Sequence, residues 1–80
     1  MFWLAEQQAL IPGDRILGAQ GGGLRLCPES WLYWVRVNRD ELRALLMPLL
    51  ELPIERVVVS HGEPVLRGGA EALRRCLSNH

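Results

Sequence analysis

The sequence contains no lysine, and its nine arginines are balanced by nine acidic residues, so the formal net charge is zero. Without a basic surplus, nothing in the charge favours binding to nucleic acid or to an anionic membrane surface. We interpret the exclusive use of arginine as the coding bias of a GC-rich genome. No segment approaches the roughly 20 apolar residues that span a bilayer, and the start of the chain lacks the basic and apolar regions of a signal peptide. These features predict a soluble, cytoplasmic protein.

Cysteine is also scarce, and neither Cys27 nor Cys76 has the Cys-x-x-Cys or Cys/His spacing of a zinc site. Reduced thiols are expected, while a single disulfide is compatible with the sequence. No internal repeat or second domain is visible, and 80 residues fit one small domain. Because a core of this size supplies only a few kcal/mol, association with a partner or ligand often has to help.

The first part of the chain has the pattern of a β-hairpin. Two short apolar runs, 2–5 and 9–11, flank a polar connection at 6–8. Pro-Gly-Asp then ends the second run with strong turn chemistry, so the Asp14 carboxylate lies just past a strand end. Taken alone, Asp14 is more typical of an Asx turn than of a ligand. The glycine-rich segment 18–23 lacks the features of a phosphate-binding loop and is predicted to be a plain loop that borders a site.

Two helices are predicted after this region. Asn38 is a good N-cap, and Glu41 completes a capping-box-like arrangement for a helix over 39–51, with Pro48 kinking or fraying its last turn. A final helix over 70–78 is expected to bury three residues, Leu73, Cys76 and Leu77. The first helix carries one apolar stripe that we assign to the core. It consists of Leu42, Leu45, Leu46, Leu49 and Leu50.

The segment Val-Val-Val-Ser-His-Gly predicts a short strand over 57–59 that stops at His61. Three consecutive valines show no alternation, so both faces of the strand should be covered, as in a sheet with flanking helices. Ligands of α/β sheets gather at the carboxyl ends of strands, which is where His61 lies. By itself, however, a histidine before a glycine is more often a hydrogen-bonded turn residue. The predicted fold class is α/β, a small sheet with flanking helices.

These elements together resemble the C-terminal portion of metallo-β-lactamase-fold hydrolases. In that family, a strand ending in Gly-Asp precedes a helix, and a later strand delivers a His-Gly element just before the closing helix. The matching segments here are Ala-Leu-Ile-Pro-Gly-Asp and Val-Val-Val-Ser-His-Gly-Glu-Pro. The resemblance implies that Asp14 corresponds to the aspartate that bridges two metals and His61 to the last histidine ligand. It also implies zinc or another divalent metal pair, part of an αβ/βα sandwich, and hydrolysis of an ester, thioester, amide or phosphoester, with the 18–23 loop, Trp31 and Trp34 bordering the substrate.

The sequence departs from the family at the main ligand cluster. The upstream His-x-His-x-Asp-His motif and a further histidine are absent, and the only histidines are His61 and the terminal His80. Asp14 and His61 cannot fill a zinc site by themselves, so the chain is not expected to be active alone. Residues 1–80 are therefore interpreted as a single partial domain that forms a homo-oligomer or is completed by another chain, because an isolated half would leave a sheet edge unpaired.

A second hypothesis treats the chain as a small non-catalytic α/β module. In this interpretation Trp31, Tyr33, Trp34 and nearby leucines mediate self-association or docking on a partner, because aromatic residues are enriched at the centres of interfaces. Asp14 and His61 would then be turn residues only. The sequence leaves both hypotheses open.

Overall fold

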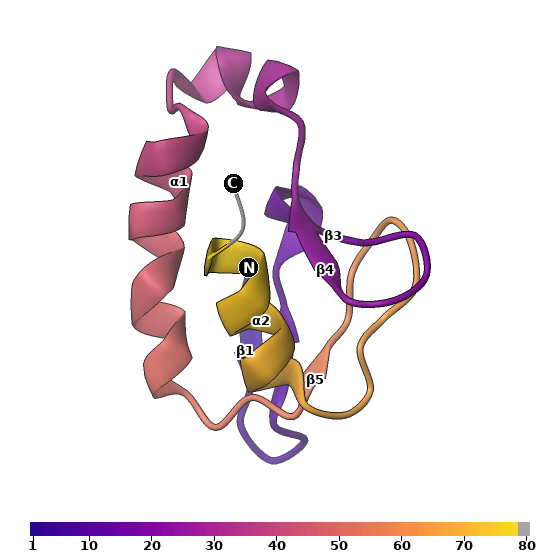
Figure 1. Ribbon diagram of the computed structural model, residues 1–80. Coiled ribbons are helices and arrows are strands. Elements are labelled where there is room, and N and C mark those ends of the chain that lie inside the picture. Colours follow the sequence, from indigo (N-terminus) through magenta and orange to yellow (C-terminus); the bar gives the residue numbers. More distant parts are fainter. Residues whose placement is uncertain (79–80) are drawn as a thin grey trace.

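The computed structural model describes residues 1–78, which form a small α/β domain with two small sheets and two α-helices (Figure 1). The predicted fold class is confirmed at this level. His80 lies outside the described residues. Within residues 1–78, neither α-helix is both long enough and apolar enough to cross a membrane.

The larger sheet has the strand order β1-β2-β5. Strands β1 (Phe2–Leu4) and β2 (Ala9–Ile11) form the predicted antiparallel hairpin, with Trp3 opposite Leu10. Strand β5 (Arg56–Val57) adds to β2 in parallel, and Leu10 is paired with Val57. Because β2 and β5 run in the same direction, their carboxyl ends lie side by side, and the segments that follow them leave the sheet next to each other.

The prediction that the valine strand is covered on both faces is wrong. Regular pairing in β5 ends at Val57, which is fully buried, whereas Val58 is 41% exposed and Val59 is only partly buried. On the side of β5 away from β2, a single antiparallel bridge joins Val57 to Val65. One residue of a partner is too little to extend the strand, so regular pairing stops at Val57.

The second sheet consists of β3 (Ile16–Gly18) and β4 (Leu24–Leu26), which pair in antiparallel register. The glycine-rich segment between them is a loop, as predicted. Three successive glycines, Gly21, Gly22 and Gly23, have φ angles of +84°, +108° and +81°. These angles are ones that other residues rarely adopt.

Helix α1 (Arg39–Leu46) begins at the predicted N-cap, where the Glu41 backbone N–H donates to Asn38 Oδ1 over 2.8 Å. It ends earlier than predicted and continues as a 3-10 helix, Met47–Glu51, because Pro48 cannot donate a backbone hydrogen bond. Leu42 and Leu46 are buried, but Leu45 is 65% exposed, so the predicted five-residue core stripe is wrong at this position.

Helix α2 (Gly69–Ser78) packs against β4, β5 and the 3-10 helix that follows α1. Its predicted inner face is confirmed, since Leu73, Cys76 and Leu77 are all buried. Together with Ile16 and Val57, which are fully buried, these residues belong to one hydrophobic core shared by both sheets and both helices. This core fixes the two strand ends from which the candidate site is built.

Candidate functional site

Asp14 and His61 lie side by side. His61 Nε2 is 3.5 Å from Asp14 Oδ1, and the two side chains are 59% and 67% exposed. Asp14 lies in a short 3-10 helix, Gly13–Arg15, directly after β2, and His61 follows the extended segment after β5. The parallel pairing of β2 with β5 explains the proximity, because both residues leave the sheet at its same edge. The two residues singled out in the sequence therefore do meet in space.

The backbone at His61 is held by the end of β3. The His61 carbonyl accepts a hydrogen bond from the Gly18 N–H over 2.8 Å. The following residue, Gly62, has a φ of +87° and lies against Gly18 so closely that a Cβ there would be 2.6 Å from the Gly18 carbonyl oxygen. The turn that carries His61 is thus fixed by backbone contacts between two glycines.

Ser60 is a site residue that no sequence pattern indicated. Its hydroxyl donates to Asp14 Oδ1 over 2.6 Å, the same oxygen that faces His61. The bond links the two segments directly and restrains the carboxylate. The sequence shows only a serine next to a histidine at a strand end. Its role becomes visible once the structure places Asp14 opposite the hydroxyl.

Trp31 is the aromatic residue that borders the site. Its ring meets the His61 ring edge to face, with centroids 5.7 Å apart and planes inclined by 67°. It comes from a 3-10 helix, Glu29–Val35, which also contains Tyr33 and Trp34. Tyr33, on the same 3-10 helix, is 75% exposed.

An open pocket of about 420 Å³ lies beside Asp14. Arg15, Cys27 and Trp31 line it together with Ser30 and Asp14 itself. Burial raises the pKa of the Cys27 thiol, an effect that the positive charge of Arg15 partly offsets. The thiol is therefore uncharged at neutral pH, and Arg15 supplies the positive charge in this pocket.

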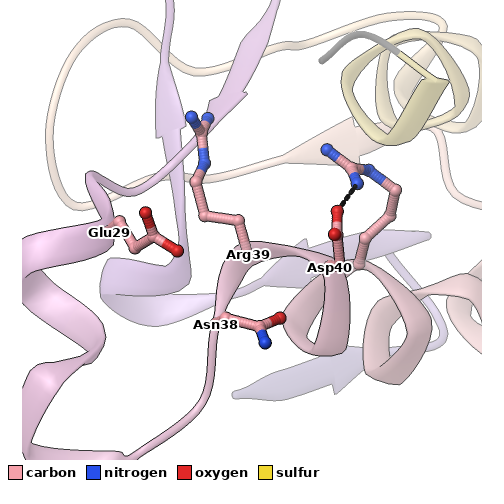
Figure 2. Close-up of a pocket in the computed structure, with 5 residues that line it drawn as sticks. Glu29, Asn38, Arg39 and Asp40 are labelled. Atoms are coloured by element: carbon pink, nitrogen blue, oxygen red, sulfur yellow. Dashed lines mark hydrogen bonds and ion pairs between the residues drawn. The ribbon is translucent and has the colours of Figure 1, made fainter.

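Two of the other hollows bear on the surroundings of the Asp14–His61 pair. One, of about 550 Å³, is formed by the glycine-rich loop, Arg25 and the Gly62–Glu63 backbone, so the loop borders the turn that carries His61. The other lies at the start of α1 and is lined by charges of both signs (Figure 2). There Arg43 and Asp40 form an ion pair of 2.8 Å, and Arg39 and Glu29 line the same hollow.

The donor atoms at the site fit part of a metal centre. Two ligands of one tetrahedral zinc, each bonded at about 2.0–2.1 Å, lie about 3.3 Å apart. The observed distance of 3.5 Å between His61 Nε2 and Asp14 Oδ1 is close to this value. Among residues 1–78, however, no group of three or more histidine, cysteine, aspartate or glutamate side chains is arranged to hold a metal ion. The pair alone would provide two ligands of the three or four that zinc requires.

Comparison with known proteins gives no further assignment. No protein-family model matches the chain, and neither the curated proteins nor the solved structures provide a significant match.

Proposed function

We propose that this chain is the C-terminal portion of a metallo-β-lactamase-like metal-dependent hydrolase. Asp14 and His61 would each supply one ligand to a divalent metal site. The observation that carries the proposal is the 3.5 Å distance between His61 Nε2 and Asp14 Oδ1, two residues that come from different strand ends. A histidine nitrogen and a carboxylate oxygen are the donor types that zinc takes in hydrolytic sites.

The neighbouring residues have roles that suit this chemistry. The Ser60 hydroxyl donates to Asp14 Oδ1 over 2.6 Å and orients the carboxylate, and this oxygen, which faces His61 Nε2, keeps a second lone pair for a metal ion. The Gly18 N–H holds the His61 backbone over 2.8 Å, which restrains the backbone from which the imidazole projects. Ligands held in this way lose little entropy on binding. A bound divalent ion would supply the Lewis acidity that such hydrolases use.

The remaining ligands would come from a complementing chain or from a second copy. The surface offers a place for such an addition, because β1 pairs only with β2 among the described residues and exposes Phe2 and Leu4. An unpaired apolar strand edge is a template for pairing with another chain. Hydrolysis by residues 1–80 alone is therefore not expected.

Zinc titration followed by calorimetry and native mass spectrometry tests the proposal. The wild-type protein is expected to take up about one zinc per chain or per dimer, and Asp14→Ala and His61→Ala should each abolish this binding. Glu6→Ala removes an exposed carboxylate in the β1–β2 turn and serves as the matched control. Unchanged zinc stoichiometry in both site variants would refute the assignment.

A docking module is the second candidate function. The observation in its favour is the exposure of large aromatic side chains on one short 3-10 helix, with Trp31 47% and Tyr33 75% exposed. Exposed apolar side chains in a group are typical of interaction sites. If this function is correct, Tyr33→Ala weakens association and His61→Ala does not. The opposite pattern favours the metal site.

A further inference from the structure

We propose that the pocket beside Asp14 binds a small aromatic or apolar carboxylate, with Arg15 as the residue that pairs with the carboxylate and Trp31 as the apolar wall. The assignment of this pocket as the substrate pocket rests on the proposed function. The binding of a carboxylate by the pocket does not depend on that function. The pocket of about 420 Å³ can hold a group of that size.

Arg15 is placed to receive an anion. It follows Asp14 in the same 3-10 helix, is half-buried, and lines the pocket. Across residues 1–78, no carboxylate lies within ion-pair distance of its guanidinium. Partial burial of an unpaired cation costs free energy that an incoming anion would recover. A planar carboxylate matches the guanidinium because it can accept two parallel hydrogen bonds.

Arg15 is the single cation in the lining of the pocket. Cys27 is buried and lines the pocket as a neutral thiol, and Ser30 contributes an uncharged hydroxyl. Asp14 is the single acidic residue in the lining; its Oδ1 accepts the Ser60 hydroxyl and faces His61, and within residues 1–78 it forms no ion pair with Arg15. Arg15 is therefore the group in the lining that can pair with an anion.

Trp31 is shared by the pocket and the candidate metal ligands. It lines the pocket, and its ring meets the His61 ring with the centroids 5.7 Å apart. An apolar or aromatic group that stacks on this indole would therefore lie next to both Asp14 and His61. A carboxylate on the same molecule would reach Arg15, while the other end would point to the proposed metal site.

Benzoate is the probe, and benzamide is its neutral isostere. The metal-free protein is titrated with each in turn, and binding is followed by ¹H–¹⁵N NMR at the indole N–H of Trp31 and the amide of Arg15. Benzoate is expected to shift both signals to saturation with an affinity about tenfold higher than that of benzamide. Equal affinities for benzoate and benzamide, or no shift of the Trp31 indole signal, would overturn the inference.

The variants assign the effect to one side chain. Arg15→Gln should lower the affinity for benzoate about tenfold and leave the affinity for benzamide unchanged. Arg15→Lys should have a smaller effect, because lysine keeps the positive charge but lacks the planar guanidinium that donates two parallel hydrogen bonds. Arg25→Gln, at an exposed arginine of a different hollow, is the control and should bind benzoate like the wild type. Benzoate affinity that is unchanged in Arg15→Gln would overturn the inference.

Zinc binding, measured separately, distinguishes the two proposals. Arg15→Gln should retain the zinc uptake of the wild type, since Arg15 is not a ligand. Zinc uptake with no selective benzoate binding would overturn this inference and leave the proposed function intact. Selective benzoate binding without zinc uptake would support a carboxylate-binding pocket and refute its assignment to a metal-dependent hydrolase.

Discussion

Gly18 and Gly62 meet backbone to backbone beside the candidate site. A Cβ on Gly18 would lie 2.5 Å from the backbone N and O of Glu63, and a Cβ on Gly62 would lie 2.6 Å from the Gly18 carbonyl oxygen. Neither position has room for a side chain without movement of the backbone. The contact brings the end of β3 to the turn that follows His61, so the position of the His61 backbone depends on two residues that have no side chain.

Replacing either glycine by alanine should therefore destabilise the fold. Gly62→Ala combines a positive φ with the close contact, and we expect it to lower the free energy of unfolding by about 2–4 kcal/mol. Gly18→Ala has the close contact without a positive φ and should cost about 1–3 kcal/mol. Urea unfolding followed by circular dichroism measures both values.

Gly23→Ala separates the two causes. Gly23 has a φ of +81°, similar to that of Gly62, but nothing lies within 4 Å of a Cβ built there. Its replacement by alanine should lower the free energy of unfolding by about 1 kcal/mol, because only the positive φ is unfavourable for alanine there. If Gly62→Ala and Gly23→Ala prove equally destabilising, the close approach to Gly18 contributes nothing.

The sequence was sufficient to identify Asp14 and His61 as residues at strand ends, but not to establish that they meet. Their proximity depends on β5 pairing in parallel with β2 rather than with another strand. Strand order is set by packing between segments far apart in the chain, which periodicity does not encode. Local signals, by contrast, gave correct predictions, as the Asn38 cap and the β1–β2 hairpin demonstrate.

Other features were not predictable for the same reason. Ser60 and Arg15 matter because of what lies opposite them, namely Asp14 and an open pocket. Leu45 fits the helical period of its neighbours and lies within α1, yet it is 65% exposed. Which flank of a helix is covered depends on the segments packed against it, and the period of the helix does not encode that.

Removing the Ser60 hydroxyl should weaken metal binding much more than it weakens the fold. The hydroxyl and the Asp14 carboxylate are both exposed, so Ser60→Ala is expected to change stability by less than about 0.5 kcal/mol. Loss of an orienting hydrogen bond to a ligand typically costs about 10- to 100-fold in metal affinity. Calorimetric zinc titration measures this loss, and Ser60→Thr, which keeps a hydroxyl, should retain most of the affinity. Wild-type zinc affinity in Ser60→Ala would show that the bond has no orienting role.

The N-cap of α1 offers a stability prediction independent of the site. Asn38 Oδ1 accepts the Glu41 N–H over 2.8 Å, and its removal leaves that donor without a partner from the helix. Asn38→Ala should destabilise the protein by about 1 kcal/mol, while Asn38→Asp should be close to the wild type because aspartate caps equally well. The melting temperatures of the wild type, Asn38→Ala and Asn38→Asp, measured by thermal unfolding under the same conditions, test this prediction. A melting temperature of Asn38→Ala equal to that of the wild type would contradict the role of the cap.

Stability should fall at high pH because of Cys76. Burial raises the pKa of this thiol to about 11, against the opposing positive charges of Arg43 and Arg39. In the unfolded chain the thiol ionises near its ordinary pKa, so above about pH 8.5 the unfolded state binds fewer protons than the folded state, and stability decreases as pH rises. The expected loss between about pH 8.5 and 11 is on the order of 1–3 kcal/mol. Cys76→Ala should show a shallower pH dependence in urea unfolding, and identical slopes would contradict the assignment.

The exposed edge of β1 predicts self-association. Phe2 is 69% exposed on a strand that pairs only with β2 among the described residues, and β1 contains neither a charge nor a proline to block further pairing. We expect sedimentation velocity at tens of micromolar protein to give a mass above the 9.0 kDa of one chain. Phe2→Lys places a charge on this edge and should restore the monomer, whereas Leu45→Lys, at a similarly exposed apolar residue on α1, should not. A compact monomer in the wild type would mean that the edge is protected, and a complementing chain would then have to reach Asp14 and His61 by another face.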